Sequence, residues 1–174
     1  TMSAAMVNLA SDGTTFMGVF GTACVRGNAT ATTWANGTAL PLAAQTGHQY
    51  FTGLAGSVTT FMVRDNASAT TAYLTTDAAV TAWATVTLPA TINGGITSVP
   101  GLFVAYNTTT SYYTSATGAT GSWTARTAPA PIQLVVRDGT GSTIYAWNTT
   151  VGGPIYACTD GINFVDTGFD TITT

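Results

Sequence analysis

The segments that decide the fold are four similar stretches: FMGVFGTACVRG (Phe16–Gly27), FMVRDNASATTAYLTTD (Phe61–Asp77), LFVAYNTTTSYYTSATG (Leu102–Gly118) and IYAWNTTVGGPIYACTDG (Ile144–Gly161). In each stretch an apolar strand leads into a polar turn, and a second strand follows that ends near a small polar residue. Four copies along one chain indicate an internal repeat, which constrains the architecture more strongly than any single strand does.

More strand candidates surround each copy. One lies upstream in every unit, at Ala5–Ser11, Tyr50–Gly56, Ile96–Gly101 and Ile132–Gly139. An aromatic residue follows each copy, and these residues are Trp34, Trp83, Trp123 and Phe164. About four short strands per unit, in units of roughly 36 to 47 residues, are typical of a β-propeller blade. We therefore predict one domain over 1–174 with units at about 4–47, 48–90, 91–130 and 131–174.

The composition supports an all-β fold. Threonine is abundant, only 6% of the residues are charged, and lysine and glutamate are absent. Threonine suits the solvent face of a strand, whereas amphipathic helices need Leu, Glu and Lys at a period of about 3.6 residues. We predict an all-β protein of four repeats of a short four-stranded antiparallel unit, β-propeller-like. A β-sandwich with internal duplication is the alternative.

Two of the copies end in a motif with a family resemblance. TTDAAVTAW (Thr75–Trp83) and CTDGINF (Cys158–Phe164) resemble degenerate Asp-boxes, the Ser/Thr-x-Asp-x-Gly-x-x-Trp hairpins of sialidase-like and related β-propellers. The resemblance implies a structural turn, in which the aromatic residue packs between sheets. It assigns such a role to six residues: Thr75, Asp77, Trp83, Cys158, Asp160 and Phe164. In the other copies we align Thr114-x-Ala116 and Cys24-x-Arg26, which lack the aspartate.

Catalysis is disfavoured because the chain lacks residues and motifs that common catalytic sites require. Sialidases need a glutamate, which this chain lacks, and the seven aspartates mostly lie in turn sequences such as SDG, RDG and TDG. Aspartate is favoured in such turns because its side chain accepts hydrogen bonds from nearby backbone amides. Serine-nucleophile and phosphate-loop motifs are absent. We expect no enzyme activity and no catalytic residue.

No cofactor or metal site is expected. The single histidine, His48, has no second metal-ligating residue near it in the sequence. Cys24 and Cys158 align as equivalent third-strand positions, too far apart for a disulfide if their copies are neighbouring blades. Four dispersed arginines at a net charge of −3 predict no nucleic acid partner, and no apolar run is long enough for membrane insertion.

Two aromatic residues and the asparagines that follow them form a candidate binding site. Tyr106 and Trp147 hold matching places in AYNTT and AWNTT, where Asn107 and Asn148 follow them. A flat ring can stack on the apolar face of a sugar while amides and hydroxyls bind its edge. These four residues are the candidate glycan-binding residues. Packing of the two rings between blades is the alternative interpretation, and we favour it.

A low-charge, lysine-free, Thr/Ala/Gly-rich repeat chain resembles virion surface proteins of tailed phages, such as head decorations, head fibres and tail receptor-binding domains. The resemblance implies a non-enzymatic structural or adhesion module on a virion surface or outside a cell. Its expected partners are further copies in a homo-oligomer, other virion proteins and a host-surface glycan. The alternative hypothesis is a secreted glycan-binding β-propeller lectin.

Overall fold

The computed structural model describes residues 8–12, 14–20, 23–28, 30, 32–41, 51–54, 60–65, 68–77, 80–138, 141–148 and 152–171. Within these residues it contains strands and no helix. The strands are β1 (Asn8–Ser11), β2 (Phe16–Phe20), β3 (Ala23–Gly27), β4 (Trp34–Gly37), β5 (Phe51–Gly53), β6 (Phe61–Arg64), β7 (Thr71–Thr75), β8 (Ala84–Thr87), β9 (Gly95–Val99), β10 (Leu102–Tyr106), β11 (Ser111–Ser115), β12 (Thr124–Thr127), β13 (Leu134–Arg137), β14 (Ile144–Trp147), β15 (Pro154–Cys158) and β16 (Val165–Asp170).

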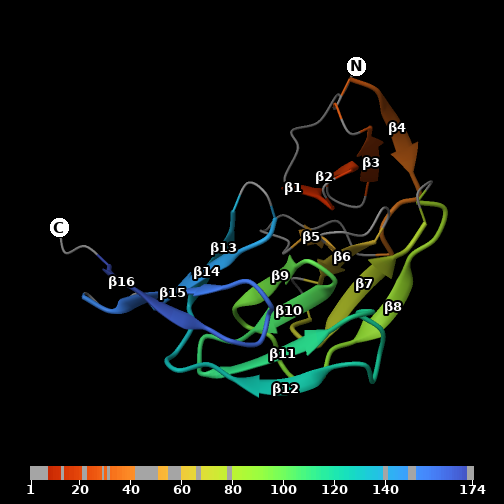
Figure 1. The fold of residues 1–174 in the computed structure, drawn as a ribbon. Helices are drawn as coiled ribbons and strands as arrows, with labels where there is room; N and C mark the ends of the chain where they lie inside the picture. The colour runs from red at the N-terminus through yellow and green to blue at the C-terminus, as the bar shows by residue number, and fades with distance from the viewer. Residues whose placement is uncertain are drawn as a thin grey trace.

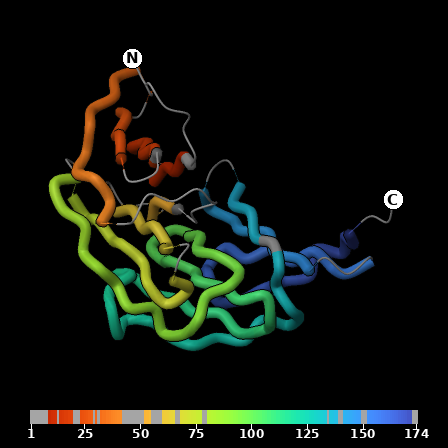
Figure 2. The backbone as a smooth tube through the Cα atoms, turned by 180° about the vertical axis from the view of Figure 1, so that it is seen from behind, coloured from red at the N-terminus to blue at the C-terminus, as the bar shows by residue number. Residues whose placement is uncertain are grey.

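The strands form four antiparallel sheets, each of four strands in chain order. We call them blade 1 (β1–β4), blade 2 (β5–β8), blade 3 (β9–β12) and blade 4 (β13–β16). The first strands β1, β5, β9 and β13 lie on the inside, where β5 contacts β1 and β9 contacts both β5 and β13. Figures 1 and 2 show the blades following one another around this centre. The predicted all-β, β-propeller-like class is confirmed.

The strand register shows which residues of the four blades are equivalent. The first and second strands pair at Ser11 with Phe16, Gly53 with Phe61, Ser98 with Phe103, and Arg137 with Ile144. The predicted second strands therefore begin in the right places. In blade 3, however, the equivalent of Phe61 and Ile144 is Phe103, one residue later than the aligned Leu102.

The blades stack through alternate residues of their second strands, because successive side chains of a strand point to opposite faces. We call the side of a blade that is turned toward the next blade its forward face, and the opposite side its backward face. Met62 on the forward face of blade 2 shares a core cluster with Phe103 on the backward face of blade 3. Val104 and Tyr106 on the forward face of blade 3 pack with Ile144 of blade 4 in the same way. Each central blade is thus buried on both faces.

The aromatic residues that follow the third strands lie at matching places between the third and fourth strands or at the start of the fourth. They are Trp34, Trp83, Trp123 and Phe164. All four are half-buried, not largely buried as their apolar character suggested. Trp83 packs on the two clusters that join blades 1 and 2. Trp123 and Phe164 pack on the clusters between later blades. The rings of Trp83, Trp123 and Phe164 each cover the rim of an inter-blade core.

Among the described residues there is no helix long and apolar enough to cross a membrane. Among the same residues no group of three or more His, Cys, Asp or Glu side chains is placed to hold a metal ion. His48 lies outside the described residues.

Candidate functional site

The innermost strands meet at the side chain of Arg137, the last residue of β13. Its Nη1 donates to the carbonyl oxygen of Gly53 at 3.0 Å and to Ser98 Oγ at 2.8 Å. Its Nη2 donates to the carbonyl oxygen of Ser11 at 2.7 Å. Ser11, Gly53, Ser98 and Arg137 are the register-equivalent residues of the four blades, and we call them the axial row. One guanidinium therefore links blade 4 to each of the other three.

The other residues of the axial row also lie in close contact with one another. Ser98 Oγ donates to the Gly53 carbonyl oxygen at 2.6 Å. A Cβ atom on Gly53 would stand 2.6 Å from the backbone of Ser11, so no larger residue fits there. Burial lowers the pKa of the Arg137 guanidinium, and the nearby charges of Asp138 and Asp12 oppose that shift. Arginine keeps its charge under these conditions, because its ordinary pKa lies above about 12.

Tyr106 and Asn107, two of the candidate glycan-binding residues, do not present a binding platform. Tyr106 is only 6% exposed, in the core between blades 3 and 4. A Cβ atom on Gly94 would stand 2.4 Å from the tyrosine ring, which shows how closely backbone covers it. Asn107 accepts a hydrogen bond from the backbone N–H of Asn93 through Oδ1, at 3.2 Å. The structure supports packing between blades for Tyr106.

Trp147 and Asn148 occupy the equivalent place in blade 4, at and just after the end of β14. Both are half-buried. Trp147 alternates with Ile144 and Ala146, which face blade 3, so its ring belongs to the forward face of blade 4. Tyr106 and Trp147 therefore lie on the forward faces of blades 3 and 4. Blade 4 covers Tyr106, whereas none of the described blades covers Trp147.

Thr75, Asp77 and Trp83 lie around the turn that follows β7. Asp77 Oδ2 accepts hydrogen bonds from the backbone N–H of Thr81, at 2.9 Å, and from the hydroxyl of Thr81. Thr75 Oγ1 accepts the backbone N–H of Asp77 at 3.3 Å. The indole Nε1 of Trp83 donates to the carbonyl oxygen of Thr38 in blade 1 at 3.0 Å. These contacts order a hairpin and tie it to the neighbouring blade.

Cys158, Asp160 and Phe164 lie around the corresponding turn of blade 4. Asp160 Oδ1 accepts the backbone N–H groups of Asn163 and Ile162, both at 2.8 Å. These two hydrogen bonds hold the pKa of the Asp160 carboxyl well below its ordinary value. Phe164 meets Tyr112 of blade 3 edge-on, with ring centroids 5.3 Å apart. The aspartate orders the turn, and the aromatic residue contacts the preceding blade.

The turns of blades 1 and 3 use residues that the sequence alignment missed. In blade 1, Asn28 Oδ1 accepts the backbone N–H of Thr32 at 2.8 Å. In blade 3, Ser115 Oγ accepts the backbone N–H of Gly118 at 2.8 Å. Ser115 ends β11 as Thr75 ends β7, so the aligned Thr114-x-Ala116 is one residue early. Asparagine and serine supply the same kind of acceptor as aspartate, which a search for aspartate overlooks.

The two cysteines are free and buried. Cys24 is the second residue of β3, whereas Cys158 is the last residue of β15, so they are not equivalent positions as the alignment suggested. Burial raises the pKa of each thiol to about 11. Neither is therefore a reactive thiolate at neutral pH.

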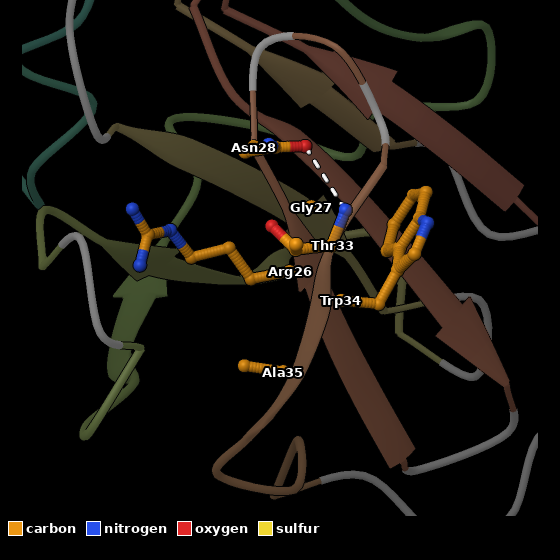
Figure 3. Close-up of a pocket in the computed structure, with 6 residues that line it drawn as sticks. All are labelled: Arg26, Gly27, Asn28, Thr33, Trp34 and Ala35. Carbon is orange, nitrogen blue, oxygen red and sulfur yellow. Dashed lines mark hydrogen bonds between the residues drawn. The ribbon is translucent and has the colours of Figure 1, made fainter.

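A cavity of about 250 Å³ lies at the end of blade 1. Its lining residues are Arg26, Gly27, Asn28, Thr33, Trp34 and Ala35. Figure 3 shows that the side chains of Arg26 and Trp34 extend to opposite sides of the strand pair, with the Asn28–Thr33 hydrogen bond between them. The indole and the guanidinium therefore do not converge on one point, as a clamp for a charged ligand would require.

Exposed apolar side chains gather on the forward face of blade 4. Val136 pairs with Tyr145, Tyr145 with Ala157, and Ala157 with Val165, so these side chains form one row across the sheet. Val136 is 49% exposed, Tyr145 38% and Val165 64%. In the matching row of blade 3, Thr97, Val104 and Thr114 are buried, and Val104 packs in the core that blade 3 shares with blade 4. None of the described blades packs on this stacking surface of blade 4.

Blade 1 presents the complementary surface, its backward face. Met17 and Val19 of β2 pack toward blade 2. Leu9 pairs with Gly18, which lies between them in the strand and therefore points to the other side. Leu9 is 52% exposed. Trp34 lies on the same side. It pairs with Gly27, and a Cβ atom on Gly27 would stand only 3.0 Å from the Trp34 ring.

Comparison with known proteins gives a likeness of fold only. No protein-family model and no curated protein sequence matches the chain. Solved structures do match. A GH74 enzyme of Niastella koreensis aligns with 90% of this chain and 24% of its own, at 16% identity and a TM-score of 0.54. Kuenenia stuttgartiensis hydrazine synthase aligns with 95% of this chain and 52% of its own, at 8% identity and a TM-score of 0.58.

A third structure is an S. cerevisiae complex of Dbp5 with Nup159 and Gle1, which aligns with 98% of this chain at 11% identity and a TM-score of 0.58. Here 45% of the matched chain is covered. The present chain thus spans between about a quarter and a half of the length of these structures. At such identities the likeness establishes a β-propeller-like arrangement of four-stranded sheets.

Proposed function

We propose that this chain is a non-enzymatic structural or adhesion module that works as part of a larger assembly, of the kind carried on the surface of a phage particle. The observation that carries the proposal is the forward face of blade 4. Among the described residues, most of the exposed large apolar side chains belong to this blade: Val136, Tyr145, Ile162, Val165 and Phe169. Contiguous apolar patches on a protein surface mark interaction sites.

The composition supports the same proposal. With 6% charged residues the chain has little electrostatic repulsion to keep neighbouring molecules apart. Its exposed strand residues include threonines such as Thr124 and Thr127, whose hydroxyl and methyl groups both suit an interface. Contacts of this kind depend on apolar burial and neutral hydrogen bonds, so salt should weaken them little.

Fractionation of the native source on a density gradient tests the proposal. The chain should sediment with large particles and should remain with them after a wash in about 1 M salt, where the Debye length is only about 3 Å. An antibody against the purified chain provides the readout. Recovery of the chain only at the top of the gradient, at the position of a free monomer, would contradict the proposal.

Glycan binding is the second candidate function, and the cavity beside Trp34 favours it. The lining of the cavity includes Trp34, Asn28 and Thr33, a mixture of apolar and polar groups that suits a sugar. Screening of the purified chain on a glycan array tests this candidate, with Trp34→Ala as the variant and Trp123→Ala as the matched control. Binding that both variants retain, or no binding at all, would exclude this site.

A further inference from the structure

We infer that the forward face of blade 4 binds the backward face of blade 1 of a second copy of this chain, so that copies associate head to tail. The inference rests on the proposed function, since it names the partner of that surface. The contact would repeat, between two molecules, the stacking that joins successive blades within one molecule.

The first step of the argument is the repeated interface. At each of the three junctions inside the chain, the forward face of one blade covers the backward face of the next with apolar side chains. Tyr106 is the forward residue at the end of β10, and blade 4 covers it until only 6% remains exposed. Trp147 is its equivalent in blade 4. The surface around Trp147 is therefore the equivalent, in blade 4, of a surface that binds a blade in blade 3.

The second step is that blade 1 has a backward face on which none of the described blades packs. Leu9 is 52% exposed on blade 1, on the side opposite the residues that pack on blade 2. Within one molecule, Arg137 joins β13 to Ser11 at the axis, yet Val136 and Leu9 both stay exposed. Blade 4 therefore does not cover blade 1 of its own chain. The four described blades therefore offer one forward face and one backward face.

Charge decides between a head-to-tail contact and a symmetric one. Blade 4 and its flanking residues carry one arginine and four aspartates, which are Asp138, Asp160, Asp166 and Asp170. A two-fold contact between two copies of blade 4 would bring these like-charged sets together, which is unfavourable. The first 41 residues, by contrast, carry one aspartate and one arginine, Asp12 and Arg26. Blade 4 therefore meets less repulsion from blade 1 than from another blade 4.

Such a contact uses different surfaces on the two molecules. Contacts of this type produce closed rings when the rotation between copies closes, and open chains of molecules when it does not. Either product suits a surface structure built from many copies. The size of the assembly then depends on protein concentration, and its growth stops when one of the two faces is blocked.

Complementary blocking of the two faces tests the inference. The full chain is examined by light scattering over about 1–100 μM, alongside Leu9→Asp, which blocks the backward face, and Tyr145→Asp, which blocks the forward face. Val165→Asp is a second forward-face variant, chosen because Val165 is 64% exposed and outside the core. Thr85→Asp, at an exposed position of β8, is the matched control. Circular dichroism confirms that each variant is folded.

The expected result is that the wild type and Thr85→Asp associate, and that each blocked variant alone is monomeric. A mixture of Leu9→Asp with Tyr145→Asp should form dimers, since each supplies the face that the other lacks. Association of Leu9→Asp alone would overturn the inference in favour of a blade 4–blade 4 contact. A wild type that stays monomeric over this range would overturn it too. In that case, sedimentation of the chain with native particles would still support the proposed function.

Discussion

Arg137 and Ser11 are joined by a 2.7 Å hydrogen bond from the guanidinium Nη2 to the backbone carbonyl oxygen, although 126 residues separate them. The bond connects the last blade to the first across the centre of the molecule. The same guanidinium reaches blades 2 and 3 through Gly53 and Ser98. Because a backbone carbonyl without a partner is costly to bury, the arginine satisfies acceptors that no strand pairing reaches.

Replacement of Arg137 by methionine should lower the free energy of unfolding by about 2–3 kcal/mol, because hydrogen bonds to a charged donor are lost from several acceptors at once. Chemical denaturation of the variant measures this loss. Arg126→Met is the control, since Arg126 makes one long hydrogen bond, 3.3 Å, to Thr114 Oγ1. The control should lose less than about 1 kcal/mol. Equal losses in the two variants would contradict the special role of Arg137.

Replacement of Trp83 by alanine should cost about 2–3 kcal/mol, below the range of about 3–5 kcal/mol for a fully buried tryptophan, because the ring is half-buried. Trp83→Phe keeps most of the packing and loses only the bond to the Thr38 carbonyl, so it should cost about 1 kcal/mol. Thermal and chemical unfolding measure both. Equal stability of the two variants would show that the ring does not stabilise the protein by packing between blades 1 and 2.

Gly161→Ala should destabilise the protein more than Gly121→Ala. Both glycines have a positive φ, +72° and +79°, so both variants pay a backbone cost of about 1 kcal/mol. Only at Gly161 would the new Cβ also meet a neighbouring blade, 2.7 Å from Leu102 Cδ2. Overpacking of this kind adds about 1–3 kcal/mol. The difference between the free energies of unfolding of the two variants, from chemical denaturation, measures the effect of the contact between blades 3 and 4.

Asp160→Asn should show a stability difference from the wild type that depends on pH. The folded state lowers the pKa of Asp160 below its unfolded value of about 3.9. The stabilisation by the charged carboxyl is therefore complete above that unfolded pKa, and it is lost as the pH falls through the folded pKa. Unfolding free energies of both proteins between about pH 2 and pH 7 measure the effect. A difference that is constant over this range would contradict the prediction.

Cys24 and Cys158 should react slowly with a thiol reagent in the folded protein at about pH 8, because the raised pKa of each thiol leaves little thiolate and because both are buried. In denaturant both should react within seconds to minutes. The absorbance of the chromophore that the reagent releases gives the number of thiols that have reacted. Rapid reaction of one thiol under native conditions would show that its strand opens locally.

Much of the fold follows from the sequence, since the order of apolar strands, polar turns and aromatic residues predicts the four sheets. The register of blade 3 does not, because Leu102 and Phe103 are adjacent and both apolar. One packs toward blade 4 and the other toward blade 2. A strand that is buried on both faces loses the alternation of apolar and polar residues that fixes register in half-exposed strands.

The surfaces were harder to predict than the strands. Tyr106 and Trp147 have the same local sequence, and they differ in exposure because blade 4 packs on Tyr106, a contact that no local pattern records. The role of Arg137 is equally invisible in sequence, because its acceptors are two backbone carbonyls and one serine hydroxyl from three other blades. Contacts with backbone leave no residue type to recognise.

The axial row also limits how alike the four repeats can be. A designed consensus protein made of four identical copies of blade 4 would place four guanidinium groups around one axis, where they would repel one another. Four copies of blade 2 would instead leave carbonyl groups at the axis without a donor. Identical units cannot supply one donor and three acceptors at equivalent places. Gene duplication can therefore produce this architecture only if at least one copy has diverged at that position.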